Sequence, residues 1–389
     1  MRLLRRPLSI QNVNTKIDHG SLLLSLQVFT WTLIVFLLGG CAVARVNPQA
    51  SLKIRFLDEY IIPADFHVSG TLVGGLSDLD YDGEFFYTVC DLPSAPRIYR
   101  FSLDIKNSKI DTLQFLEVIP VDTESTQLVF DSEGVIYHPD EKRFTLSSEG
   151  SINRGRDPFV AELDRNGQVQ ELYDLPAYFL SSHASGPRNN SVFEGLCESV
   201  DGKGIWVANE LPLKGDGPEP GIFEKHAPIR FTRLDRSTKK PERQFAYDLD
   251  RVRKIPLLPF GMNGVTAIEE YEEERFLVLE RGFSAGYGRH GFRVLLYLAD
   301  GREADSTLEV NRLKEVKPST VTLANKSLLF DFNSIRKELT NRSVDNLEGM
   351  TFGPTLPNGN RTLVLIADNN FNTLMKQMNQ VILMEVVGE

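Results

Sequence analysis

Three features of the sequence predict an all-β protein that folds as a β-propeller of five four-stranded blades. A hairpin unit repeats along the chain, the last copy ends one strand short, and an unpaired strand precedes the first copy. A ring of blades explains all three, because one blade shared by the two chain ends leaves no open sheet edge. Two separate β-sandwiches would explain neither the repeat nor the short last unit. Six blades are the alternative count, if residues 61 to 76 build another.

The repeated hairpin opens at a glycine-containing step and ends its second strand on an acidic residue. The two marked positions lie 14, 16, 16, 17 and 20 residues apart in successive units, which predicts the same hairpin each time. The units start 56, 61, 69 and 85 residues apart, so loops of different length separate the blades. The marked pairs are Ser77 and Asp91, Glu133 and Glu149, Glu194 and Glu210, Asn263 and Glu280, and Glu348 and Asp368.

A third and a fourth strand follow the hairpin in most units. The third strand ends on an aspartate, as in "RIYRFSLD" and "FRVLLYLAD", and the fourth is recognisable in segments such as "QELYDLP". The last unit stops after its third strand, "QVILMEVV", so the unpaired strand "LKIRFLDEYIIP" is expected to complete that blade. Helical periodicity is scarce, and residues 334 to 341 offer one short candidate.

The first forty residues predict an export signal. Basic residues precede an apolar run from Leu22 to Leu38, and small residues follow it. The string Leu38-Gly39-Gly40-Cys41 resembles the bacterial lipobox, in which the cysteine carries the lipid. An uncleaved transmembrane anchor is the alternative, because the run is nearly long enough to span a bilayer. We therefore expect an exported protein of the cell envelope, a periplasmic or surface lipoprotein, with a signal peptide over 1–40, a linker over 41–50 and the propeller over 51–389.

Composition and net charge limit the kinds of partner that the protein can bind. The chain has 389 residues, 41% hydrophobic and 25% charged, as an ordinary globular protein does, and its formal charge is −10. That charge, with no basic stripe, argues against a nucleic acid-binding surface. Only Cys90 and Cys197 remain after Cys41, and the sequence leaves open whether they form a disulfide or stay as buried thiols.

Repetition predicts a carboxylate cluster, because equivalent positions in a propeller converge around one axis. If the marked second strand is innermost, its terminal acids lie near one mouth of the channel, with Glu133, Glu194 and Glu348 close by. Carboxylates so close together need a cation or a basic side chain. Calcium fits best, since asparagine oxygens accompany the acids; magnesium is the runner-up, and the scattered histidines make zinc unlikely. The alternative is structural: these acids could bond neighbouring blades together. The asparagines are Asn263, Asn346, Asn369 and Asn370.

Two further features bear on chemistry. Arg281, Arg154, Arg156 and Lys214 lie close in sequence to the marked acids, and basic groups beside a metal can grip a phosphate, although plain ion pairs are an equal alternative. The string "GFSAG" around Ser284 matches a nucleophile elbow and follows a strand, but no helix follows it. We therefore expect Ser284 in a loop at the channel mouth and give esterase chemistry little weight.

The repeats resemble the phytase-like family described as "esterase-like activity of phytase". The matching stretches include "DSEGVIYHPDEKRFTLSSEG", "NNSVFEGLCESVDGKGIWVANELPLKGDG" and "DNLEGMTFGPTLPNGNRTLVLIADNNF", and with the first and fourth units they cover nearly the whole body. The resemblance implies an exported protein whose repeated Glu and Asp residues carry the hydrolysis of phosphoric esters. Its expected substrate is a phosphorylated small molecule or a phosphodiester.

On this interpretation the reaction is metal-assisted hydrolysis, with Glu194 or Glu210 as general base and Arg281 stabilising the developing charge. The non-catalytic alternative is an envelope-tethered binding propeller whose carboxylates are structural. The expected catalytic residues are Glu194, Glu210, Glu280 and Arg281; the expected metal ligands are Asp91, Glu133, Glu149, Glu348 and Asp368; the expected substrate-binding residues are Arg154, Lys214, Asn369 and Asn370; and Cys41 is the expected lipidation site.

Overall fold

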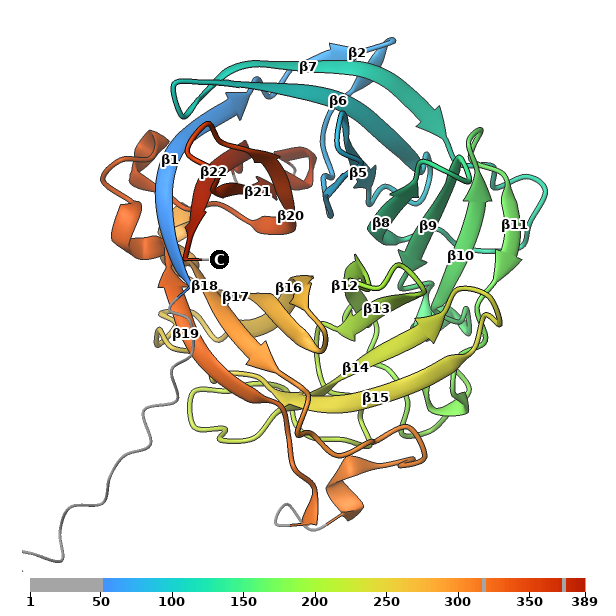
Figure 1. Cartoon of the computed structure of the whole chain (residues 1–389). Coiled ribbons are helices and arrows are strands. Elements are labelled where there is room, and N and C mark those ends of the chain that lie inside the picture. The colour runs from blue at the N-terminus through green and yellow to red at the C-terminus, as the bar shows by residue number, and fades with distance from the viewer. Residues whose placement is uncertain (1–51, 317–319, 373–375, 389) are drawn as a thin grey trace, which may run out of the picture. The chain divides into compact units, whose positions relative to one another are not determined.

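Five four-stranded antiparallel sheets form a ring in the computed structural model, which describes residues 52–316, 320–372 and 376–388 (Figure 1). The predicted five-bladed propeller is therefore confirmed. Blade 1 consists of β4 (Asp80–Tyr81), β5 (Phe86–Cys90), β6 (Arg97–Lys106) and β7 (Lys109–Pro120). Blade 2 consists of β8 (Ser132–His138), β9 (Arg143–Ser148), β10 (Phe159–Asp164) and β11 (Val169–Leu172). Blade 3 consists of β12 (Phe193–Glu198), β13 (Gly204–Asn209), β14 (Pro228–Asp235) and β15 (Pro241–Asp248).

The last two blades include the strand that closes the ring. Blade 4 consists of β16 (Gly261–Glu272), β17 (Arg275–Ser284), β18 (Phe292–Asp300) and β19 (Asn325–Asp331). Blade 5 consists of β20 (Leu347–Thr355), β21 (Arg361–Ala367), β22 (Asn379–Val387) and, from the other end of the body, β1 (Lys53–Ile62). The pairing of β1 with β22 runs from Lys53 opposite Val387 to Ile62 opposite Asn379, as predicted for the closing strand.

The channel is lined by the first strand of each unit. In Figure 1 the strands β8, β12, β16 and β20 surround the axis; the blades continue outward in chain order, except that the outermost strand of blade 5 is β1. The expectation that the marked second strand is innermost is wrong. The second strand lies one place further out, where neighbouring blades cover both of its faces, and β5, β13 and β21 are accordingly apolar and almost wholly buried. Aromatic residues fill the space between blades 3 and 4, where Trp206, Phe245 and Phe276 pack together.

Two smaller expectations are wrong. Residues 61 to 76 form no sixth blade, because β2 (His67–Val68) and β3 (Thr71–Leu72) make only a two-stranded hairpin. Residues 334 to 341 form no helix of ordinary length, since 3₁₀ turns occupy that stretch. The described 3₁₀ turns are η1 (Ile152–Arg154), η2 (Ala177–Phe179), η3 (Gly288–Gly291), η4 (Leu313–Glu315), η6 (Phe332–Ile335), η7 (Thr340–Arg342) and η8 (Asn370–Asn372).

The two body cysteines lie in different blades, Cys90 at the end of β5 and Cys197 in β12, and both are buried free thiols. Burial raises the pKa of the Cys90 thiol to about 12, so it stays protonated at neutral pH. No helix in the described part of the chain is long and apolar enough to cross a membrane. The predicted leader, Cys41 and the linker lie outside the described residues.

Candidate active site

A β-bulge places the repeated acids at one end of each hairpin. In blades 2, 3 and 5 the pairing slips by one residue at Glu133, Glu194 and Glu348. The residue just before each bulge pairs with the last residue of the second strand, so the acid that follows this strand lies beside the bulge. Bulges redirect side chains, and here they bring two carboxylates per hairpin to one end of the channel.

Close packing of neighbouring blades explains the glycine after the bulge. A Cβ on Gly134 would lie 2.5 Å from the Cβ of Leu196 in the next blade, and a Cβ on Gly349 would lie 2.7 Å from the backbone carbonyl carbon of Asp78. Real Cβ atoms do not approach other atoms so closely, so these positions need glycine. The Glu-Gly pair in the sequence therefore marks the point where the inner strands meet.

The predicted marked pair of the fourth unit, Asn263 and Glu280, is not equivalent to the marked pairs of the other units. Val265 pairs with Glu280 and Ala267 with Leu279, so the bulge residue of blade 4 is Thr266. The position equivalent to the acids of the other blades is therefore Arg281, one residue beyond the predicted Glu280. A shift of one residue turns a side chain to the other face of a strand, and blade 4 contributes a cation where the other blades contribute carboxylates.

Glu280 lies within the protein and does not line the cavity, contrary to its expected catalytic role. Its carboxylate is fully buried and accepts hydrogen bonds from the Tyr247 hydroxyl at 2.7 Å and the Asn263 amide at 2.8 Å. The Lys326 ammonium pairs with it at 2.5 Å. Because all these partners are fixed within the fold, the geometry gives Glu280 a structural role.

A cavity of about 530 Å³ lies at the end of the channel where the bulges gather. This size is typical of small-molecule sites. Its only basic residue among the described lining residues is Arg281. The acidic residues that line it are Asp91, Glu133, Glu194, Glu210, Glu219, Glu348 and Asp368. Six of these are among the predicted site residues, so the sequence located most of the cluster.

Arg281 joins three blades through hydrogen bonds inside the cavity. Its Nη1 donates to the Asn346 amide oxygen at 2.8 Å and to Glu348, and its Nη2 donates to Glu210 at 3.0 Å. Burial opposes the charge of Arg281, but the surrounding carboxylates, Glu348 first and then Glu210, raise its pKa above the ordinary value. The guanidinium is thus charged and already committed to two acids.

The carboxylates that Arg281 does not bind are poorly compensated. Burial raises the pKa of Glu133 well above its ordinary value, and repulsion from Glu194 and Glu149 adds to the effect. Burial likewise raises the pKa of Glu194, with repulsion from Glu210 and Glu149. Burial and then Asp91 raise the pKa of Asp368 to about 7. Without a further cation, several of these groups would therefore be protonated at neutral pH.

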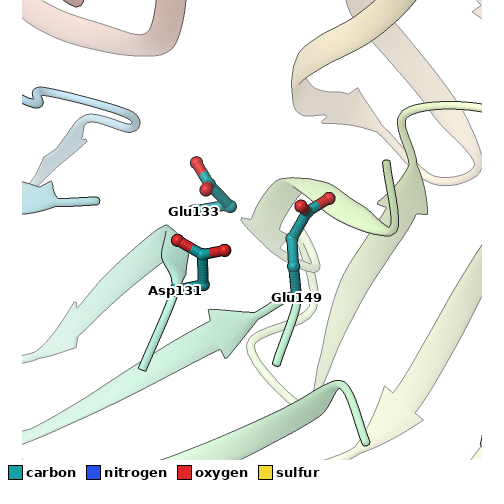
Figure 2. A group of neighbouring side chains, drawn as sticks. All are labelled: Asp131, Glu133 and Glu149. Carbon is teal, nitrogen blue, oxygen red and sulfur yellow. The ribbon is translucent and has the colours of Figure 1, made fainter. Parts of the chain in front are cut away.

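Three carboxyl groups in blade 2 meet closely enough to share one ion (Figure 2). Asp131, Glu133 and Glu149 each offer an oxygen, and these oxygens all lie within 4.8 Å of one another. Glu149 is 1% exposed; its Oε1 accepts from the Val192 amide, and its Oε2 has no hydrogen-bond partner in the described part of the chain. Such an unsatisfied buried oxygen is costly unless a cation or a proton binds it.

The sequence interpretation missed Asp131, although a signal for it exists. Asp131 precedes the bulge residue Glu133 by two positions, as Asn346, one of the asparagines expected to accompany the acids, precedes Glu348. The two oxygen donors therefore occupy the same place in two blades. Burial, followed by repulsion from Asp91, raises the pKa of Asp131 to about 6.

The predicted substrate-binding residues are only partly brought together. Asn370 lines the cavity, but Asn369 is buried and its side chain accepts from the Phe371 amide. Arg154, in η1, and Lys214 are exposed and are not among the residues that line the cavity. Arg156 is also exposed, outside the lining. Contrary to expectation, Arg154 and Lys214 therefore do not lie where they could bind a phosphate in the cavity. Arg281 is the basic residue among the described residues that line it.

The surroundings of Ser284 are not those of a catalytic nucleophile. It ends strand β17 rather than lying in a loop, is 2% exposed, and donates its hydroxyl to the Lys254 carbonyl at 2.6 Å. No histidine among the described residues is hydrogen-bonded to its hydroxyl, and Ser284 does not line the large cavity. The "GFSAG" string is therefore part of a β-hairpin and not a nucleophile elbow, which needs a strand followed by a helix.

Fold and site together define a class: a five-bladed β-propeller whose blades direct carboxylates into one cavity. Comparison with known protein families identifies the family within this class. The family model for phytase-like proteins, described as esterase-like activity of phytase, matches residues 71–371. The chain belongs to this family. No curated protein matches it significantly.

Solved structures share the architecture only distantly. The periplasmic gluconolactonase PpgL of Pseudomonas aeruginosa is 14% identical with a TM-score of 0.34, covering 87% of this chain and 100% of its own. A GH43_1 enzyme from Xanthomonas citri is 9% identical with a TM-score of 0.45, covering 84% and 89%. The Bombyx mori GH32 β-fructofuranosidase BmSUC1 is 11% identical with a TM-score of 0.42, covering 84% and 63%. Similarities this low say nothing about activity.

Proposed function

We propose that this protein is an exported, metal-dependent hydrolase of phosphoric esters that acts in the carboxylate-lined cavity. The observation that carries the proposal is the charge imbalance of the cavity: the blades supply several buried carboxylates, while Arg281 is the only basic residue among its described lining residues and already binds Glu210 and Glu348. Surplus carboxylates at close range are stable when they bind a cation. Membership of the phytase-like family supports the choice of reaction.

The residues present fit a hard divalent cation. The blade 2 cluster offers oxygen donors alone, and the unpartnered Oε2 of Glu149 is a buried acceptor in need of a positive partner. Calcium accepts such donors in a flexible shell, and magnesium is the runner-up because it requires stricter geometry. Asp131, Glu133 and Glu149 would hold the ion. When bound, it would neutralise these acids and act as a Lewis acid toward a phosphoric ester.

The other residues have separate tasks in this proposal. Glu194 lines the cavity, and its carboxylate makes no hydrogen bond within the described part of the chain, so it is free to accept a proton from an attacking water. Positive charge nearby would lower its raised pKa and ionise it. Arg281 fixes Glu210 and Glu348 and presents a buried positive charge to the negative charge that develops on the phosphoryl group.

The proposed place of action follows from the sequence. An export signal with a lipobox at Cys41 would tether the mature protein to a membrane of the cell envelope by its lipid alone. The body itself has a surplus of acidic groups, since the formal charge of the chain is −10. The proposed substrate is a phosphorylated small molecule or a phosphodiester outside the cytoplasm.

The second candidate is a non-catalytic binding propeller, and specific contacts favour it. Arg281 joins blade 4 to Glu210 of blade 3 and Glu348 of blade 5, and Glu149 binds the Val192 amide at the start of blade 3. These bonds would hold the blades together whether or not the cavity is catalytic. The two candidates differ in turnover, not in fold.

The deciding experiment uses the chain from residue 42 onward and measures phosphate release from phosphomonoesters and alcohol release from phosphodiesters, with calcium, with magnesium and with chelator. We expect turnover that chelator abolishes and that Glu194→Gln lowers by about 10²-fold or more, the usual contribution of a general base. Glu171→Gln, an exposed residue on the outer strand β11, is the matched control and should leave turnover unchanged. Absence of turnover under every condition would favour the binding propeller.

A further inference from the structure

Blade 4 differs from the other blades because its inner hairpin continues past the bulge. In blades 2, 3 and 5 the inner strand begins one residue before the bulge. In blade 4 the pairing of β16 with β17 extends outward, with Asn263 opposite Gly282, Met262 opposite Phe283 and Gly261 opposite Ser284. The extension stands beside the cavity and adds a wall that the other blades lack.

This wall is apolar and faces the same cavity as the acids. Phe283 pairs with Met262 on one side and with Phe292 of β18 on the other, so the three side chains form one row across the sheet. The rings of Phe283 and Phe292 are 4.9 Å apart, and the ring of Phe260 lies 6.2 Å from that of Phe283. All four residues line the cavity. The wall runs from Phe292, 4% exposed, to Phe260, 54% exposed at the rim.

Backbone and side-chain hydrogen bonds hold this wall in place. The Ala285 amide donates to the Phe260 carbonyl and the Leu257 amide to the Ala285 carbonyl, both at 2.9 Å. Ser284 binds the Lys254 carbonyl, as described above, and the Tyr287 hydroxyl binds the Ile255 carbonyl at 3.1 Å. The segment that carries Phe260 is thus tied to the end of β17, and a ligand need not order it. Such preorganisation lowers the cost of binding.

We infer that the substrate carries an aryl or alkyl group, which packs against Phe260, Met262, Phe283 and Phe292 while its phosphoric ester faces the carboxylates. This inference rests on the proposed function and names the substrate class of the same cavity. It disfavours a polyol with many phosphates, because such a ligand has no apolar surface to bury and would bring added negative charge to a cavity already rich in carboxylates.

The test uses two phosphonates that cannot be hydrolysed, phenylphosphonate and methylphosphonate, and measures their dissociation constants by calorimetry in the presence of calcium. Burial of a phenyl ring should make phenylphosphonate bind about tenfold more tightly or better. Phe260→Ala should remove most of this preference without changing the affinity for methylphosphonate, and Phe260→Leu should keep part of it. Phe223→Ala, a phenylalanine 88% exposed and outside the cavity lining, should change neither affinity. Equal affinity for the two phosphonates would overturn the inference.

Failure of the proposed function gives a different result. If neither phosphonate binds, phosphate recognition in this cavity is wrong, and saturation-transfer NMR with benzyl alcohol then tests the apolar wall alone. A signal that Phe260→Ala abolishes and Phe223→Ala preserves would support an apolar subsite in a protein of another function. No signal with the unmodified protein would refute the subsite itself.

Discussion

Arg281 should be worth several kcal/mol to the stability of the propeller, because it neutralises two buried carboxylates in neighbouring blades. Replacement of Arg281 by Met keeps much of the volume but leaves Glu210, 2% exposed, and Glu348, 8% exposed, without their cation. Removal of one partner from a buried ion pair typically costs 3–5 kcal/mol. We therefore expect the free energy of unfolding, measured by urea denaturation at pH 8 with chelator, to fall by about that amount.

The loss should depend on pH, and the sign follows from the two acids. Burial raises the pKa of Glu210 and of Glu348 in the folded protein, even though Arg281 lowers both. A carboxyl group whose folded pKa lies above its unfolded value destabilises the fold as pH rises from the unfolded value to the folded one. Without Arg281 the pKa values of Glu210 and Glu348 in the folded protein are raised further. Arg281→Met should therefore lower the free energy of unfolding less at pH 5 than at pH 8.

A matched surface variant separates this effect from the loss of any arginine. Arg100 pairs with Glu117 at 3.1 Å, with both side chains partly exposed, and such surface pairs contribute about 0–1 kcal/mol. Arg100→Met should therefore change stability little at either pH. If Arg281→Met cost no more than Arg100→Met, or cost the same at pH 5 and pH 8, the description of Arg281 as the cation of a buried carboxylate cluster would be wrong.

Two further changes test the blade contacts. Asp80 accepts a hydrogen bond from the Tyr137 amide at 2.7 Å, and burial raises its pKa to about 6. Stability is therefore lost as pH rises from the unfolded pKa to this folded value. Asp80→Asn should remove this loss and stabilise the protein at pH 8, by at most about 3 kcal/mol, and not at pH 4. A Tm that does not increase at pH 8 would contradict this. Gly134→Ala should cost about 1–3 kcal/mol because its Cβ would meet Leu196, while Gly221→Ala, with its nearest atom at 3.8 Å, should cost clearly less in the same thermal melt.

The repeat made the fold predictable because the same contacts recur in every blade. The closing strand followed from counting strands in the last unit, and β1 pairs with β22 as expected. The radial order of the strands was not predictable in the same way. Both strands of the hairpin are apolar, and an apolar strand covered on both faces resembles one that lines the channel.

The site was predictable where the units align without slippage. Glu133, Glu194 and Glu348 are all bulge residues, and the acid after each second strand lies beside them. Blade 4 broke the rule, since two candidates, Glu280 and Arg281, are adjacent and only the register of the pairing decides between them. Sequence spacing alone does not record a bulge.

The exceptions to the repeat explain how a symmetric ring acquires a directional cavity. A ring of identical hairpins would present only carboxylates, and mutual repulsion would then allow few of them to be charged. Blade 4 supplies Arg281 at the position of an acid, which lowers the pKa of Glu210 and of Glu348 against the effect of burial, and its longer hairpin adds an apolar wall. Blade 2 contributes Glu133 to the lining, the residue that shares a cluster with Asp131 and Glu149. A ligand in this cavity therefore meets different chemistry on different sides, and its orientation follows from the blade that departs from the pattern.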